Sequence, residues 1–327
     1  MREFDYERAT DAARAVAAVR ADPDAAFLGA GTNLVDHLKL GITAPSRLVD
    51  VSRLPFDDVT ELADGGVRVG SAVRNADLAA HPLIRRRYRM LSAALLAGAS
   101  PQLRNLATTA GNLLQRTRCP YFQDPTTPCN KRSPGSGCSA IGGFDRDHAI
   151  LGASDQCVAT HPSDMAVALT ALDAVVRVLG AEGERTIPVV DLHRLPGEDP
   201  DRDTVLDHGD LITAVDIPAL GWAAGSTYRK VRDRASFAFA LVSVAAAVDL
   251  ADGVVRDARI AFGGVAHKPW RAYAAEDTLR GQPATESAFA DAADAELAAA
   301  RPLRENGFKI PLARRVLVST LREVTGA

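Results

Sequence analysis

The sequence of 327 residues predicts an α+β protein with more than one domain. Runs with the alternation and β-branched content of strands are mixed along the chain with segments of helical period, and their order is typical of this fold class. The chain also contains 47% hydrophobic residues. A chain of this length is too long to fold around a single hydrophobic core, so we expect two or three domains or subdomains.

The first fifty residues have the pattern of a β-loop-α-β unit. Thr10 and Asp11 can cap a helix that ends before the Asp-Pro-Asp step at 22–24. A strand at 25–28 leads through a glycine-rich loop into a helix at 34–40, which Gly41 closes, and a second strand follows at 47–51. We place the end of this unit near residue 53.

Further elements follow from the same periodicities. Strands are expected at 66–70, 174–179, 211–217, 227–231, 238–250 and 256–262. Helices are expected at 75–80, 84–97, 101–106, 163–172, 285–300 and 311–324. The clearest domain boundary is the Pro- and Gly-containing stretch at 217–225. The predicted units are therefore residues 1–53, 54–221 and 222–327.

Charge and hydropathy exclude two classes of partner. The net charge is −3 and no polybasic stripe is present, so nucleic-acid binding is not indicated. No apolar run reaches the roughly 18 residues that span a bilayer, and we expect no membrane insertion. The N-terminus, MREFDYERAT, has no apolar core of a signal peptide. We therefore expect a cytoplasmic protein, or a periplasmic one exported with a partner that carries a twin-arginine signal.

All four cysteines lie within residues 119–157, a segment rich in Pro, Gly, Ser and Thr. They are Cys119, Cys129, Cys138 and Cys157, separated by nine, eight and 18 residues. Such crowding suggests one four-thiolate site, and soft sulfur ligands suit either tetrahedral zinc or an iron-sulfur cluster. Structural zinc usually recruits close CxxC pairs, which are absent here, so the spacing favours a cubane cluster.

Two features near the cysteines agree with a cluster, and two alternatives stay open. Pro120 directly follows Cys119, as in ferredoxin ligand runs, and Lys131 and Arg132 could offset the charge of a cluster. The alternatives are two structural disulfides, which would need an oxidising compartment, or four unrelated buried thiols.

The loop Gly29-Ala30-Gly31-Thr32-Asn33 is the second chemical feature. A glycine-rich turn between a strand and a helix presents backbone N–H groups to an anion, as a phosphate cradle does. It is not a Rossmann fingerprint, because Leu34 occupies the place of the third glycine, and no Gly-Lys-Ser/Thr follows as in a Walker A loop. The alternative is a tight turn that needs glycine for its conformation.

Three further segments have binding chemistry. In the segment 107–112, small residues allow a flat ring or a pyrophosphate to approach the backbone, while Thr and Asn supply hydrogen bonds. Ser163 can cap the following helix and direct its N–H groups at an acceptor, or act as a simple cap. The cations of the segment 228–232 could meet a phosphate or a flavin carbonyl, or form a solvated charge run.

Together these segments resemble the FAD-binding subunit of the molybdenum hydroxylase family, which includes xanthine dehydrogenase, carbon monoxide dehydrogenase and bacterial aldehyde oxidoreductases. The resemblance covers nearly the whole chain and rests on FLGAGTNLVDHLK, ATTAGNLLQRTRCPYF, HPSDMAVAL and YRKVRDRASFAFALVSVA. The four-cysteine insertion is similar to that of the flavoprotein subunit of periplasmic aldehyde oxidoreductases, which carries a 4Fe-4S cluster besides FAD.

The resemblance implies a PCMH-type (vanillyl-alcohol-oxidase-like) FAD-binding fold of two subdomains. It also implies a C-terminal α+β domain like that of the carbon monoxide dehydrogenase flavoprotein. The implied FAD-binding residues are Leu28, Gly29, Ala30, Gly31, Thr32, Asn33, Leu34, Thr108, Gly111, Asn112, Ser163, Asp164 and Lys230. The implied ligands of the 4Fe-4S cluster are Cys119, Cys129, Cys138 and Cys157. The implied partners are a small 2Fe-2S subunit, a large molybdopterin-binding subunit and an external electron acceptor.

The implied function is electron transfer, with the organic substrate oxidised on the molybdenum subunit and electrons delivered through FAD. In agreement, no convincing acid/base pair, Ser-His-Asp arrangement or redox CxxC is present, so we expect no catalytic residue in this chain. The seven histidines are scattered in the sequence, and each is expected to be structural or exposed. Two rival functions are a self-sufficient FAD-dependent oxidase of the same fold and a zinc-stapled interaction protein without enzymatic activity.

Overall fold

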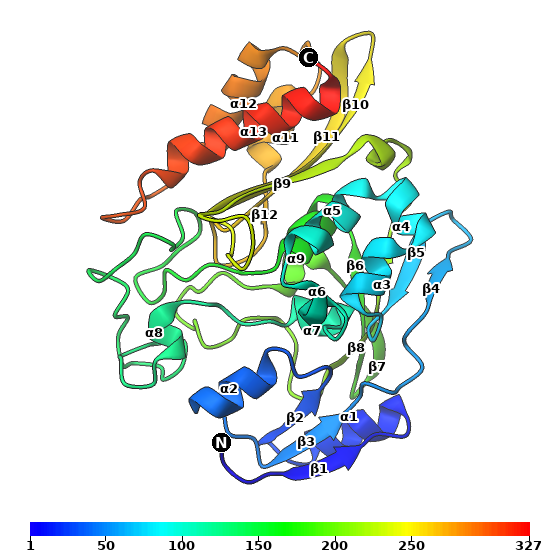
Figure 1. The fold of residues 1–327 in the computed structure, drawn as a ribbon, viewed down its shortest axis with the longest axis vertical. Coiled ribbons are helices and arrows are strands. Elements are labelled where there is room, and N and C mark those ends of the chain that lie inside the picture. The colour runs from blue at the N-terminus through cyan, green and yellow to red at the C-terminus, as the bar shows by residue number, and fades with distance from the viewer.

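The computed structural model describes residues 1–327 and contains three β-sheets, each built from a separate part of the chain (Figure 1). The N-terminal unit, in blue, lies at the bottom of Figure 1, and the C-terminal unit, in yellow to red, lies at the top. The middle unit lies between them and is covered on one side by short helices. This arrangement agrees with the α+β class expected from the sequence.

The N-terminal unit is a three-stranded parallel sheet with the order β1-β3-β2. Its strands are β1 (Asp5–Arg8), β2 (Ala25–Leu28) and β3 (Arg47–Asp50), and its helices are α1 (Ala12–Arg20) and α2 (Leu34–Leu40). Asp11 caps α1 by accepting a hydrogen bond from the backbone N–H of Arg14 at 2.8 Å. Gly41 ends α2 in the left-handed conformation, with φ of 73°. The expected β-loop-α-β order is thus present, and β1, which the sequence analysis missed, adds an edge strand.

The middle unit contains a five-stranded antiparallel sheet with the order β4-β5-β8-β6-β7. The strands are β4 (Val59–Glu61), β5 (Val67–Gly70), β6 (Val175–Gly180), β7 (Gly183–Pro188) and β8 (Leu211–Ile217). The helices are α3 (Asn75–Ala80), α4 (Pro82–Arg87), α5 (Arg89–Ala97), α6 (Pro101–Arg104), α7 (Thr109–Leu113), α8 (Pro120–Gln123), α9 (Asp164–Ala171) and α10 (Val189–Leu192). Helix α9 is buried along its whole length, because side chains from α5, β8 and the C-terminal unit surround it.

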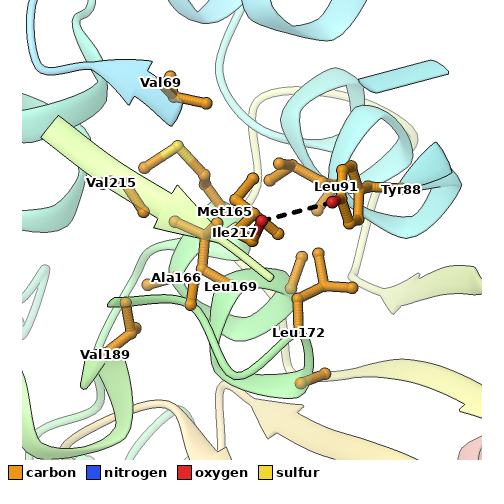
Figure 2. Packing of buried hydrophobic residues seen from close by; sticks show 14 of the residues in the cluster. Val69, Tyr88, Leu91, Met165, Ala166, Leu169, Leu172, Val189, Val215 and Ile217 are labelled. Carbon is orange, nitrogen blue, oxygen red and sulfur yellow. Dashed lines mark hydrogen bonds between the residues drawn. The ribbon is translucent and has the colours of Figure 1, made fainter. Parts of the chain in front are cut away.

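Figure 2 shows this core, in which Met165 and Leu169 of α9 lie between strand β8 and the helical segment that contains Tyr88 and Leu91. Tyr88 interrupts the helix that the sequence predicts over 84–97 and divides it into α4 and α5. Its hydroxyl donates to the carbonyl oxygen of Pro218 at 2.9 Å, and its ring is 1% exposed. Burial of this side chain therefore takes precedence over the helical period of the segment.

The C-terminal unit is a four-stranded antiparallel sheet covered by three helices. The strands are β9 (Thr227–Val231), β10 (Val242–Ala251), β11 (Val254–Gly263) and β12 (Trp270–Arg271), and the helices are α11 (Tyr273–Leu279), α12 (Glu286–Leu297) and α13 (Lys309–Thr325). The strand expected from residue 238 begins only at Val242. The preceding segment leaves the sheet as a loop, in which Phe237 has φ of 53° and is 66% exposed.

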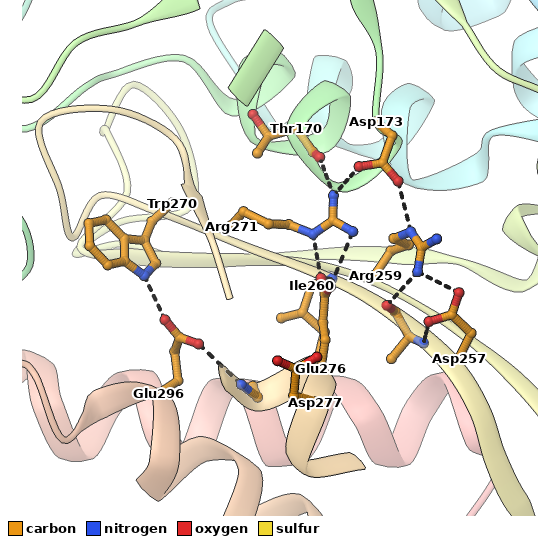
Figure 3. Close-up of polar contacts among 12 residues, drawn as sticks. Thr170, Asp173, Asp257, Arg259, Ile260, Trp270, Arg271, Glu276, Asp277 and Glu296 are labelled. Atoms are coloured by element: carbon orange, nitrogen blue, oxygen red, sulfur yellow. Dashed lines mark hydrogen bonds and ion pairs between the residues drawn. The ribbon is translucent and has the colours of Figure 1, made fainter. Parts of the chain in front are cut away.

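A buried polar network joins the C-terminal unit to helix α9 (Figure 3). The guanidinium of Arg271 pairs with Glu276, and it also donates to the backbone carbonyl of Thr170 at 2.9 Å and to Asp173. The side chains of Arg271 and Glu276 are 3% and 1% exposed. Glu276 compensates the buried charge of Arg271 within the C-terminal unit, and the bonds from Arg271 to Thr170 and Asp173 connect that unit to the end of α9.

The segment 119–157 contains little regular structure apart from α8, a β-bridge between Cys129 and Cys138, and a second bridge from Leu151 to Ala266. Turns and side-chain hydrogen bonds order it; for example, the side chains of Ser136 and Asn130 accept from the backbone N–H groups of Cys129 and Gly137. No helix in the structure has both the length and the apolarity needed to cross a membrane.

Candidate functional site

The glycine-rich loop lines a cavity of about 250 Å³ between the N-terminal and middle units. The cavity wall contains the loop 29–34, Ser71, Thr108 and Gly111. Gly31 has φ of 75°, a conformation that side-chain-bearing residues rarely adopt, so the tight turn expected for this loop is present. The loop therefore has both features considered from the sequence, a glycine turn and a wall of a cavity.

The structure brings the second candidate segment against this loop. Thr108 caps helix α7, and its Oγ1 accepts a hydrogen bond from the N–H of Gly111 at 3.3 Å. A Cβ atom added to Gly111 would lie 2.9 Å from this Oγ1, and one added to Gly29 would lie 3.3 Å from it. The two glycines, 82 residues apart in the chain by their numbers, face one hydroxyl group. Their small size is what permits this close approach.

A second cavity of about 350 Å³ continues from the first. Both cavities are lined by Thr32, Asn33 and Gly111, and the second extends to Asp164 and Lys230. Its far wall has guanidinium groups and aromatic rings, from Arg104, Arg118, Arg232, Arg234, Phe237 and Phe239. The joined space is thus elongated, with small residues at one end and cations and aromatic rings at the other. Arg232 belongs to the cationic segment 228–232 that the sequence indicated, whereas no sequence pattern pointed to the other three arginines or the two phenylalanines, which only their place on the cavity wall reveals.

Asn33 and Asn112, two of the expected site residues, are partly engaged with the protein itself. The Oδ1 atom of Asn33 accepts a hydrogen bond from the N–H of Arg116 at 2.9 Å. The Oδ1 atom of Asn112 accepts one from the hydroxyl of Ser163 at 2.6 Å. Ser163 Oγ in turn caps α9 by accepting from the N–H of Ala166 at 2.9 Å. These bonds fix Asn33 and Asn112 in the cavity wall, and Ser163 is the predicted helix cap.

Asp164 and Lys230 form a buried pair at the far end of the second cavity. Lys230 Nζ donates to Asp164 Oδ2 at 2.8 Å and to the carbonyl oxygen of Ala97 at 3.2 Å. The hydroxyl of Tyr228 donates to Asp164 Oδ1 at 2.5 Å. Burial, together with the neighbouring carboxylate, raises the pKa of Tyr228 well above its usual value, so its hydroxyl stays protonated. No sequence pattern marked Tyr228 as a site residue, although it lies two residues before Lys230 on a predicted strand and so on the same face.

The four cysteines are free thiols, and two of them, Cys129 and Cys157, are buried. Burial raises the pKa of Cys119 to about 12 and that of Cys157 to about 11, and neighbouring cysteines contribute to both shifts. Cys119 and Cys157 are each influenced by Cys129, and Cys157 also by Cys138, so the tertiary fold gathers all four. Their protons would have to leave before the sulfurs could act as ligands.

The structure contains no group of three or more His, Cys, Asp or Glu side chains placed to hold a metal ion. A single zinc ion would draw four sulfurs to about 3.8 Å from one another, given a Zn–S distance of about 2.3 Å. A cubane cluster is larger than one ion and holds its ligand sulfurs further apart. The four thiols are thus close enough to influence one another, but no three of them are arranged as a site for a metal ion.

The cysteine segment and the cavities adjoin one another. A third cavity, of about 220 Å³, is lined by Cys119 and His148 on one side and by Ser163 and Asp164 on the other. Lys131 and Arg132 were considered from the sequence as counter-charges for a cluster. The charge of Lys131 opposes the burial-driven rise in the pKa of Cys157, and both side chains also have partners elsewhere. Lys131 pairs with Asp203 and donates to the carbonyl of Pro200 at 2.7 Å, and Arg132 donates to the carbonyls of Tyr121 and Phe122 at 2.8 Å.

Three histidines that are scattered in the sequence come together in the fold. The rings of His161 and His193 lie 4.3 Å apart, and His267 is close enough to influence His161 electrostatically. All three are buried or half-buried, and burial lowers the pKa of each, to about 4 for His267. They are neutral at neutral pH, which agrees with the structural role expected for them.

Two family models match the chain. Residues 2–220 match the FAD binding domain in molybdopterin dehydrogenase, and residues 226–324 match the carbon monoxide dehydrogenase flavoprotein C-terminal domain. These matches confirm the predicted fold class, an α+β FAD-binding fold followed by a C-terminal flavoprotein domain.

Curated relatives and solved structures agree with these matches. The chain is 53% identical to the aldehyde oxidoreductase FAD-binding subunit PaoB of Escherichia coli (strain K12), over 99% of this chain and 98% of that protein. It is 25% identical to the glyceraldehyde dehydrogenase medium chain of Sulfolobus acidocaldarius, over 89% and 86% of the two chains. In fold it is similar to a chain of carbon monoxide dehydrogenase from Hydrogenophaga pseudoflava, with a TM-score of 0.77, 24% identity and coverage of 99% and 97%.

Proposed function

Because the chain belongs to the family of FAD-binding medium subunits of molybdenum hydroxylases, we propose that it transfers electrons within an aldehyde-oxidising complex of this kind. In this proposal the chain receives electrons from iron-sulfur clusters of partner subunits and delivers them to an external acceptor. The 53% identity to an aldehyde oxidoreductase subunit over nearly the full length supports aldehydes as the substrate class of the complex. Bound FAD supplies the redox chemistry, and the chain's own residues hold and surround it.

The observation that carries the proposal is the elongated space formed by the two joined cavities. A dinucleotide with a flat ring needs a small-residue end for its phosphates and a wider end for the ring. The backbone of Leu28, Gly29, Ala30, Gly31, Thr32, Asn33 and Leu34 would hold the pyrophosphate, with Thr108, Gly111 and Asn112 beside it. Asp164 and Lys230, which line the second cavity, would form the wall near the ring end, and Ser163 beside Asp164 lines the adjoining third cavity.

We also propose the domain limits 1–53, 54–221 and 222–327. The three sheets support them, because residues 5–50, 59–217 and 227–271 each contribute all strands of one sheet. The FAD space then lies where all three units meet, and the C-terminal unit supplies Lys230. The proposed partners are a small 2Fe-2S subunit and a large molybdopterin-binding subunit, as in the family.

A 4Fe-4S cluster on Cys119, Cys129, Cys138 and Cys157 is the finer part of the proposal. The support for it is the donor set, because four free thiols lie in one irregular segment and influence one another electrostatically. The cluster would order a segment that has few apolar anchors of its own. We assign it a mainly structural role.

No residue of this chain is assigned to bond-breaking on the organic substrate. Asp164, the acidic residue on the wall of the second cavity, is paired with Tyr228 and Lys230. This favours electron transfer over the rival function of a self-sufficient oxidase, which would need a free acid or base at the ring.

The testing experiment is an anaerobic absorption spectrum of the chain purified in complex with its partners, with iron, acid-labile sulfide and released flavin quantified on the same sample. The proposal predicts about four iron, about four sulfide and one FAD for each copy of this chain, after subtraction of the partners' clusters. If FAD is present without the additional iron, the proposed flavin function stands and the proposed cluster is refuted. Absence of FAD would overturn the proposed function, and aldehyde-driven bleaching of the flavin by this chain alone would favour the oxidase.

A further inference from the structure

Three buried side chains form a hydrogen-bonded series at the ring end of the proposed FAD space. Tyr228 donates to one oxygen of Asp164 at 2.5 Å, and Lys230 donates to the other at 2.8 Å. We propose that Tyr228 is a positioning residue, which acts through Asp164 to fix the ammonium group of Lys230 beside the flavin ring. This inference rests on the proposed FAD site and assigns a new role within it.

The register of the sheet places the two donors on one face. Tyr228 and Lys230 are two residues apart on β9, so their side chains project to the same side of the sheet. Their partners on β10 are Ala245 and Ser243, both small, which leaves room for the larger side chains. Helix α9 begins at Asp164 and presents its carboxylate between the two donors. The middle and C-terminal units therefore meet through this carboxylate.

The chain at Gly98 limits the space beside the carboxylate of Asp164. A Cβ atom added to Gly98 would lie 3.1 Å from Asp164 Oδ2, so the chain at Gly98 packs directly against this oxygen. With the hydroxyl of Tyr228 on Oδ1 and the ammonium of Lys230 on Oδ2, Asp164 has little freedom to move. Because Tyr228 remains protonated, it is a permanent donor to Oδ1.

Lys230 keeps one donor for a group in the cavity. An ammonium group has three N–H donors, and Asp164 and the carbonyl of Ala97 accept two of them. The third is free for an oxygen or nitrogen acceptor in the cavity that Lys230 lines. A cation beside the ring favours the additional negative charge of a reduced flavin, and the hydrogen bond from Tyr228 reduces the extent to which Asp164 cancels that cation.

This arrangement predicts opposite effects for two conservative changes. Tyr228→Phe removes the hydroxyl, concentrates the charge of Asp164 on Lys230 and makes the flavin midpoint potential more negative. Asp164→Asn removes the negative charge and makes the potential more positive. Lys230→Met shifts the potential in the negative direction by more than Tyr228→Phe. If Tyr228 acts through Lys230, the Tyr228→Phe change has little further effect in a Lys230→Met background.

The experiment measures FAD content and flavin midpoint potential for each variant in the assembled complex. Tyr88→Phe is the matched control, because Tyr88 is a buried tyrosine with a hydrogen-bonded hydroxyl that does not line the FAD space. The expected result is full FAD content, with a negative shift for Tyr228→Phe and none for Tyr88→Phe. An unchanged potential in Tyr228→Phe, or equal shifts with and without Lys230, would overturn the inference. If the Tyr228→Phe variant loses FAD, the flavin midpoint potential of the Asp164→Asn variant tests the inference instead. A negative shift or no shift in that variant would contradict the proposed role of the Tyr228–Asp164–Lys230 series. Lack of FAD in the unmodified complex would instead refute the proposed function.

Discussion

The Nε2 atom of His148 lies 3.2 Å from the Sγ atom of Cys119. The backbone carbonyl of His148 accepts hydrogen bonds from Lys309 at 3.0 Å and from Asn306 at 3.2 Å. Both of these residues belong to the C-terminal unit and are 0% exposed. The cysteine segment, which is inserted in the middle unit, is therefore held in place by the C-terminal unit.

Lys309→Met should loosen the cysteine segment. Lys309 donates to the carbonyls of Asp147, His148 and Gly264 at 2.8 to 3.0 Å, and a methionine would leave these buried acceptors without a donor. We expect a loss of about 2 kcal/mol or more in stability and faster proteolysis within residues 119–157. Limited proteolysis with mass spectrometry would locate the cleavage. The control is Lys39→Met at an exposed position, which should behave as the unmodified chain, and equal protection of the two variants would contradict the prediction.

Cys129→Ser should lower the iron content of the chain. Cys129 is buried and bridges to Cys138 through backbone pairing, so serine preserves the local fold and removes one sulfur ligand. We expect loss of the additional iron and of complex assembly, because the segment depends on its cluster for order. Iron analysis and size-exclusion chromatography would measure both. Ser133→Ala, at an exposed position of the same segment, is the control, and normal iron content in Cys129→Ser would refute the four-ligand assignment.

Gly111→Val should lower the FAD content. A Cβ atom at this position already lies 2.9 Å from Thr108 Oγ1, and the branched side chain would occupy the space between the two candidate loops. We expect less FAD released per chain on denaturation, with the fold retained as judged by circular dichroism. Gly221→Val is the matched control, because a Cβ atom there meets nothing within 4 Å. Full flavin occupancy in Gly111→Val would remove this residue from the site.

The buried histidines should make the protein less stable in mild acid. Burial lowers the pKa of His267 to about 4, below the ordinary value of 6.5. Between pH 6.5 and pH 4 the unfolded chain therefore binds a proton that the folded chain does not, and stability falls as the pH falls through this window. The loss from His267 approaches about 3 kcal/mol at pH 4. Thermal unfolding from pH 7.5 to pH 4.5 should show a shallower decline for His267→Gln, and identical slopes would contradict the assignment.

The pair of Arg271 and Glu276 should matter far more than an exposed pair. Arg271→Leu leaves the buried carboxylate of Glu276 without its partner and removes the contacts with Asp173 and Thr170. We expect a loss of about 3–5 kcal/mol and earlier unfolding of the C-terminal unit in calorimetry. Arg314→Leu is the matched control, because its pair with Asp294 at 2.6 Å is exposed. That change should cost less than about 1 kcal/mol, and similar losses for both variants would disprove the role of burial.

Local sequence determined most of the elements that have a clear apolar period. The strand at Ala25–Leu28, the helix at Leu34–Leu40 and the strand at Leu211–Ile217 lie where the sequence predicted them. Strands β1 and β7 were missed because their side chains are mostly exposed, so their sequences lack the alternation of a half-buried strand. Pairing with a neighbouring strand, not burial of one face, defines them.

The candidate site divides in the same way. The sequence by itself determined the glycine turn, the Ser163 cap and the crowding of four cysteines, because each is a short-range pattern with a local physical cause. Only the tertiary structure decided which groups meet. Tyr228 and Asp164 are 64 residues apart, Asn112 and Ser163 are 51 apart, and His148 reaches Cys119 across 29. Such contacts depend on how the units pack against one another. The spacing of residues along the chain determines local geometry, but it does not determine which distant side chains meet.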